Sequence, residues 1–149
     1  RRCVMKKTLP FAVLFVLVAI LSACGKGESA NVSVSYADAD THSKYPSYLE
    51  YNDDYGETHI LIVPDATVYD FKIVNVGFDE VGNDIKLKIT DTVYSAEELS
   101  PEKPIRAYIS LGETIPIRGI SYRNKNGEVK SYGLGISGKD GSLILTEIE

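Results

Sequence analysis

The chain has 149 residues, of which 21 are acidic and 16 are Lys or Arg, so its formal net charge at pH 7 is −5. Binding to nucleic acid needs clustered cations, and this acidic balance argues against nucleic acid as a partner. The same balance argues against a peripheral electrostatic grip on anionic lipid.

The first element along the chain is an apolar run from Leu9 to Leu21, which follows Lys6 and Lys7. As a helix this run would be about 20 Å long, whereas the hydrocarbon core of a bilayer is about 30 Å thick. The run is therefore too short to span a membrane comfortably. A basic start, a short apolar stretch and small residues at its end are typical of a signal peptide.

The end of the run, Leu21-Ser22-Ala23-Cys24, resembles the lipobox of bacterial lipoproteins. The resemblance implies that a diacylglycerol is attached to Cys24 and that the chain is cleaved before it. Two acyl chains hold a protein stably on a membrane. We therefore expect export and anchoring to the membrane through the lipid on Cys24, at the outer face of the cytoplasmic membrane or at the outer membrane.

These expectations divide the chain into three parts. Residues 1–23 are predicted to be the signal peptide. Residues 1–4 precede Met5 and are interpreted as lying upstream of the residue at which translation starts. Residues 24–33 are small and polar, which predicts a flexible tether. Residues 34–149 are predicted to form a single domain.

Removal of residues 1–23 leaves 126 residues, with 12 basic and 21 acidic side chains and a net charge of −9. If Cys24 is acylated, this mature part has no free thiol. That would exclude disulfides, cysteine zinc sites and thiol nucleophiles.

β-strand patterns dominate the predicted domain. Short runs of alternating or continuous apolar residues recur at spacings near ten residues, and turn residues separate them. The expected strands are residues 31–36, 48–51, 58–63, 67–78, 84–90, 105–111, 117–123, 128–137 and 142–148. This pattern predicts an all-β protein, an antiparallel β-sandwich of immunoglobulin-like architecture, with a small β-barrel as the alternative. Residues 119–148 loosely resemble small lipoprotein domains of unknown function.

Two local features refine these strands. The apolar phase slips by one residue at Ile73-Val74, which predicts a β-bulge. Asn126-Gly127 between two strand patterns predicts a hairpin.

Two further expectations concern residues 84–100. In residues 84–90 the alternation predicts that Ile85, Leu87 and Ile89 point into the core. Residues 95–100 predict one or two turns of helix, because Ser95 can cap it and Pro101 stops it.

Gly133, Gly135 and Gly138 form the spacing GxGxxG, but they lie within a strand pattern rather than at the start of a helix. A dinucleotide site needs that turn to open a helix. We therefore interpret Gly133 and Gly135 as making room for a neighbouring segment, and residues 138–141 as a hairpin turn.

The segment from residue 38 to residue 59 is rich in acidic and aromatic side chains and contains both histidines of the chain, His42 and His59. Carboxylate oxygens are the ligands that Ca²⁺ prefers. An EF-hand loop starting at Asp38 fails, since Ser43 and Leu49 stand where Gly and Glu are needed. The remaining candidates for a calcium site are Asp38, Asp40, Asp53, Asp54 and Glu57.

Tyrosines in the same segment allow a second interpretation. Tyr is enriched in recognition surfaces because it provides amphipathic contact area at low entropic cost. The predicted contact surface consists of Tyr45, Tyr48, Tyr51 and Tyr55.

Catalysis has little support, since the chain lacks GxSxG, HExxH and a free mature cysteine. A catalytic triad is defined by geometry, so His42 or His59 beside a serine and a carboxylate would revive this possibility. No catalytic residue is predicted.

The sequence therefore leaves three hypotheses. The preferred one is a lipid-anchored, non-catalytic module that binds an envelope protein or a glycan. The alternatives are a calcium or small-solute binder, and an envelope hydrolase or an inhibitor of one.

Overall fold

The computed structural model describes residues 30–149, and the predicted signal peptide and Cys24 lie outside this range. The described residues form nine strands and one short helix, α2 (Thr41–Lys44). The strands are β1 (Val32–Tyr36), β2 (Leu49–Asn52), β3 (Thr58–Pro64), β4 (Val68–Val81), β5 (Asp84–Leu99), β6 (Ile105–Ile109), β7 (Arg118–Arg123), β8 (Val129–Ile136) and β9 (Leu143–Glu147).

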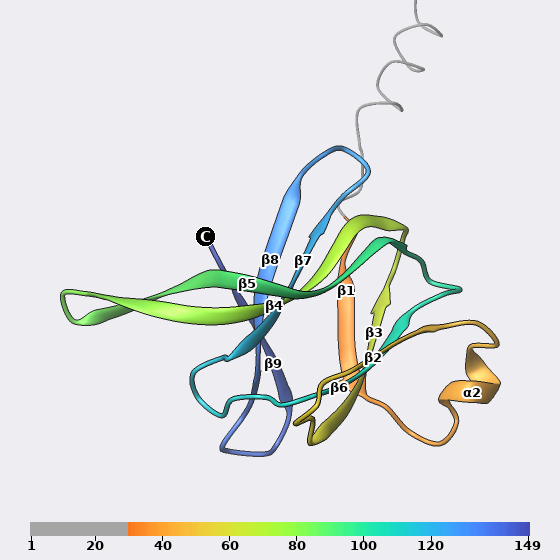
Figure 1. The fold of residues 1–149 in the computed structure, drawn as a ribbon, viewed down its shortest axis with the longest axis horizontal. Helices are drawn as coiled ribbons and strands as arrows, with labels where there is room; N and C mark the ends of the chain where they lie inside the picture. Colours follow the sequence, from red (N-terminus) through yellow and green to blue (C-terminus); the bar gives the residue numbers. More distant parts are fainter. Residues whose placement is uncertain (1–29) are drawn as a thin grey trace, which may run out of the picture.

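The strands form two sheets that pack against each other (Figure 1). One sheet has the order β1-β3-β6-β2, and the other has the order β5-β4-β7-β8-β9. Pairing is antiparallel except between β2 and β6, which run parallel. The predicted all-β sandwich is confirmed, and two separate sheets exclude the alternative of one small closed barrel.

The core lies between the two sheets and is built from the inward faces of their central strands. Ile60 and Ile62 of β3 and Ile120 of β7 are completely buried in one cluster with Phe71 of β4. Burial of one such side chain stabilises the fold by roughly 1.5–3 kcal/mol.

The tether prediction was wrong for its last residues. Ala30 is buried in the core cluster, and β1 begins at Val32, inside the range 24–33 that was expected to be flexible. The reason is that Val32 and Val34 pack against the core while β1 pairs with β3.

The predicted bulge and turns are confirmed. The pairing of β4 with β5 shifts register between Ile73 and Val74, and again between Asn75 and Val76. The turn at Asn126-Gly127 joins β7 to β8, and Gly127 has φ +89°, a conformation that favours glycine. Residues 138–140 form the turn between β8 and β9.

The close-packing role predicted for Gly133 is also confirmed. A methyl group added at Gly133 would lie 2.8 Å from the ring of Pro116, which is closer than carbon atoms can pack. On the same face, a methyl group added at Gly119 would lie 2.8 Å from the side chain of Val76. These two glycines therefore let neighbouring segments lie directly on this sheet.

The helix predicted for residues 95–100 was wrong. Residues 95–99 belong to β5, where Ala96 pairs with Phe71 and Glu98 pairs with Tyr69 of β4. Pairing with a buried neighbouring strand decides the conformation here, and it overrides the weak local preference for a helix.

The inward orientation predicted for Ile85, Leu87 and Ile89 was wrong as well. Ile85 is 52% exposed, Ile89 is 40% exposed and Leu87 is half-buried. β4 has 14 residues and β5 has 16, whereas β3, the longest strand of the opposite sheet, has seven. The outer part of the β4–β5 hairpin therefore extends past the opposite sheet as an arm, which we define as residues 77–90 (Figure 1).

Candidate functional site

The predicted acidic and tyrosine-rich segment runs along one edge of the first sheet. It contains α2, the edge strand β2, the turn after β2 and the start of β3. β2 is four residues long, so its two ends lie about 13 Å apart. Side chains before β2 and after it therefore reach the surface at different places.

Tyr45 and Tyr48 lie on the loop that follows α2, and both are half-buried. The hydroxyl of Tyr48 lies 2.7 Å from Nδ1 of His42, and the two rings meet edge to face with their centroids 5.2 Å apart. The ammonium group of Lys44 lies 5.6 Å from the centroid of the Tyr45 ring. Each of the two tyrosines therefore contacts a side chain of α2.

Tyr51 differs from the other tyrosines because it points inward from β2. It packs against the core cluster, and its ring centroid lies 5.3 Å from that of Tyr94 on β5. Burial raises the pKa of the Tyr51 hydroxyl, and the nearby Asp53 carboxylate raises it further. Tyr51 therefore joins the two sheets and is not part of an open contact surface.

Tyr55 lies on the turn between β2 and β3, and 84% of its surface is exposed. Its backbone is nevertheless held in place, because the hydroxyl of Ser110 donates a hydrogen bond to its carbonyl oxygen. The structure thus presents one aromatic side chain from a fixed turn.

The acidic candidates for calcium are not brought together. Asp38 accepts a hydrogen bond from the backbone N–H of Asp40 at 3.1 Å, in the turn before α2. Asp54 and Glu57 are exposed. Within residues 30–149, no three His, Cys, Asp or Glu side chains lie close enough together to hold a metal ion.

Asp53 has a structural partner instead. Its carboxylate accepts a hydrogen bond from Arg118 at 2.6 Å, and the two side chains are only 13% and 20% exposed. Because Asp53 follows β2 and Arg118 begins β7, this ion pair bridges the two sheets. The hydrogen bond from Arg118 lowers the pKa of the Asp53 carboxyl.

Both histidines have aromatic neighbours. His42 contacts Tyr48, and the ring of His59 stacks on that of Tyr108 with the centroids 4.3 Å apart. A triad would need a histidine that bridges a serine hydroxyl and a carboxylate. The hydrogen-bond partner of His42 is the Tyr48 hydroxyl.

The arm is a surface feature that the sequence patterns did not predict. One face of the arm carries apolar side chains, since Phe78 pairs with Leu87 and Val76, at the base, pairs with Ile89. The opposite face is charged: Asp79 pairs with Lys86, and Nζ of Lys88 lies 2.6 Å from Asp79. The signal in the sequence was the length of the two alternating runs on either side of Gly82. The strands that they form are longer than any strand of the opposite sheet that could cover them.

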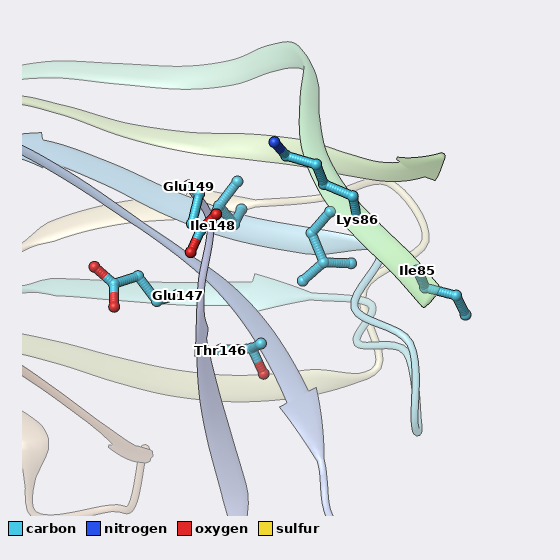
Figure 2. A pocket seen from close by; sticks show the side chains of 7 residues that line it. Ile85, Lys86, Thr146, Glu147, Ile148 and Glu149 are labelled. Atoms are coloured by element: carbon cyan, nitrogen blue, oxygen red, sulfur yellow. The ribbon is translucent and has the colours of Figure 1, made fainter. Parts of the chain in front are cut away.

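The apolar face of the arm curves over the outer face of its own sheet. Residues 85–87 of β5 and residues 146–149 at the end of the chain line an open pocket of about 300 Å³ (Figure 2). A methyl group added at Gly133 would lie 3.5 Å from Leu87, so the arm approaches β8 at this glycine. The pocket therefore lies between the arm and the end of β9.

Among the described residues, no helix is long and apolar enough to cross a bilayer. Comparison of the chain with family models, curated proteins and solved structures gave no match.

Proposed function

We propose that this protein is a lipid-anchored cell-envelope protein that acts as a non-catalytic binding module. The anchor is the diacylglycerol on Cys24, and the contact surface is the turn that carries Tyr55. Tyr45 and Tyr48 lie at the other end of β2 and are not part of this surface. The partner is an envelope protein or a glycan. The resemblance of residues 21–24 to a lipobox supports the anchor.

The observation that carries the binding function is the presentation of Tyr55. An exposed aromatic side chain on a turn held by a hydrogen bond loses little conformational entropy when a partner covers it. Tyr51, which was predicted to belong to the contact surface, is excluded from it because its ring packs inward against Tyr94.

The position of Tyr55 suits an anchored protein. Val32, near the start of the described chain, pairs with Pro64 at the end of β3. Tyr55 precedes Thr58, which begins β3, and this strand of seven residues is about 23 Å long. A lipid anchor that precedes Ala30 would therefore leave Tyr55 at the end of the sandwich that faces away from the membrane.

The anchor is tested by metabolic labelling with a fatty acid that carries a chemical tag, followed by mass spectrometry of the protein. We expect the tag on a peptide that begins at Cys24, and we expect a Cys24→Ala variant to lose the tag and leave the membrane fraction. Unlabelled wild-type protein would contradict the anchor.

The contact surface is tested by placing a photo-crosslinking amino acid at position 55 of the full chain in intact cells. The matched control position is Val129, which is 65% exposed at the β7–β8 hairpin, at the other end of the sandwich (Figure 1). We expect a discrete crosslinked product at position 55 that is absent at position 129. Identical products at both positions, or none at position 55, would overturn the assignment of Tyr55.

A further inference from the structure

Part of each edge strand of the five-stranded sheet complements part of the other in charge. β5 forms one edge and β9 forms the other. Within residues 30–149, β5 pairs only with β4, and β9 pairs only with β8. Each edge therefore presents a row of backbone groups that another strand can use.

On the outer face of the sheet, residues 85–89 of β5 are apolar, and β9 carries Ile144 and Thr146. Ile85, Leu87 and Ile89 belong to this face of β5, because Leu87 lies over Gly133 and cross-strand partners share a face. Ile144 belongs to the same face of β9, since it pairs with Gly135. Ile85, Ile89 and Ile144 are each at least 40% exposed.

On the other face, residues 85–89 of β5 carry lysines, and the end of β9 carries glutamates. Lys86 and Lys88 alternate with the apolar residues of β5, and both are exposed. Glu147 pairs with Tyr132 and so lies on that face of β9, and Glu149 follows two residues later. Leu143 and Leu145 share this face of β9 with Glu147, because they pair with Ile136 and Leu134 of β8. The acidic match to Lys86 and Lys88 therefore lies at the end of β9, at Glu147 and Glu149. Lys88 also pairs with Asp79 of its own chain.

Pairing of β5 with another β5 is disfavoured by the same charges. Two copies of β5 side by side would bring lysines close to lysines on one face, and like charges on neighbouring strands repel. Lysine on an edge strand is a common protection against such pairing. The acidic edge of β9 removes that obstacle.

Within one chain, β5 and β9 lie on either side of the pocket in Figure 2 and do not pair with each other. We propose that the occupant of the β5 edge is a second copy of this chain, which adds its β9 edge to β5. The contact joins two different surfaces of the molecule, so it closes into a dimer only if each copy both gives and receives a strand. The proposal is independent of the lipid anchor and of Tyr55.

The test uses two full-length copies with different affinity tags, expressed together and extracted in mild detergent. One tag is captured, and the amount of the other tag is measured. The first variant is Lys86→Glu with Lys88→Glu, and the second is Glu147→Lys with Glu149→Lys. We expect each to lower co-capture about fivefold or more, the size of effect typical of coupled charge pairs.

Combining all four reversals in both copies restores opposite charges, so we expect co-capture to return to within about twofold of the wild-type level. The matched control for the lysine variant is Lys103→Glu with Lys125→Glu, which changes the net charge by the same amount at exposed positions outside residues 85–89 and β9. We expect this control to leave co-capture unchanged.

Two results would overturn the proposal. One is wild-type protein that shows no co-capture, which would mean that the β5 edge binds another protein or pairs within its own chain. The other is co-capture that falls in the paired reversals and does not recover when they are combined. The reversed side chains are exposed, and exposed ion pairs such as Lys88–Asp79 contribute little to folding, so loss of the fold does not confuse the readout.

Discussion

β4 and β5 contribute to the body of the sandwich and also form the arm, yet the side chains of these two parts differ in their exposure to solvent. Phe71 and Phe78 both belong to β4; the first is completely buried and the second is 44% exposed. The difference lies in what faces them, because the opposite sheet covers Phe71 and ends before it reaches Phe78. Strand pairing alone therefore extends a hairpin beyond the core, and apolar side chains placed there remain available for contact.

The largest expected effect compares these two phenylalanines. Phe71→Ala should lower the free energy of unfolding by about 3–5 kcal/mol, because it removes a fully buried ring and leaves a cavity. Phe78→Ala should cost less than about 1 kcal/mol. Equilibrium unfolding with denaturant measures both, and equal losses would mean that the arm is part of the core.

Glycines provide the second comparison. A methyl group at Gly119 would lie 2.5 Å from the carbonyl oxygen of Tyr132, so Gly119→Ala should destabilise the protein by about 1–3 kcal/mol. A methyl group at Gly77, on the arm, would lie 2.9 Å from the side chain of Thr90. Thr90 is exposed and can move, so Gly77→Ala should change stability by about 0.5 kcal/mol or less. If the two substitutions have equal effects, the backbone around Gly119 is less constrained than the structure indicates.

The ion pair between the sheets gives a pH-dependent prediction. Asp53→Asn should cost about 1–3 kcal/mol at neutral pH, because Arg118 loses a charged hydrogen-bond partner. The pKa of Asp53 is lowered in the folded state from about 3.9 in the unfolded chain. Its contribution is therefore fully present above that unfolded pKa, and it is lost as the pH falls through the folded pKa.

Unfolding curves recorded from neutral pH to acid test this prediction. The wild-type protein should lose stability more steeply below about pH 4 than Asp53→Asn. Asp54→Asn is the matched control, because the side chain of Asp54 is exposed and forms no ion pair within the described residues. A parallel pH dependence of wild type and Asp53→Asn would contradict the role given to Arg118.

The smallest expected effect lies on the charged face of the arm. The side chains of Lys88 and Asp79 are 49% and 60% exposed. Lys88→Ala should therefore change stability by no more than about 0.5 kcal/mol, as is usual for exposed ion pairs. A loss of 2 kcal/mol or more, well above that rough range, would show that the arm depends on this pair.

Sequence patterns predicted the body of the fold well, because its strands are buried and therefore show clear apolar periods. The continuous apolar run of β3 became a central strand, and the phase slip at Ile73-Val74 became a bulge. Asn126-Gly127 predicted its turn through backbone conformation alone.

The failures occur where tertiary contacts decide the outcome. The alternation of Ile85, Leu87 and Ile89 correctly showed that they share a face, but periodicity cannot show whether another sheet covers that face. Residues 95–99 have helix-compatible composition, and only their pairing with β4 makes them a strand. In the tyrosine-rich segment, the inward packing of Tyr51 depends on Tyr94, which is distant in the sequence.

The difference between arm and body is tested most directly by hydrogen exchange of the full chain in detergent, measured over a range of protein concentrations. If β9 of a second copy covers β5, the outward-facing amides of residues 85–89 should exchange more slowly as the concentration rises. Amides of Ile60 and Ile62 in β3 should stay equally protected throughout, since they lie in the core. Exchange in residues 85–89 that is independent of concentration would contradict the account.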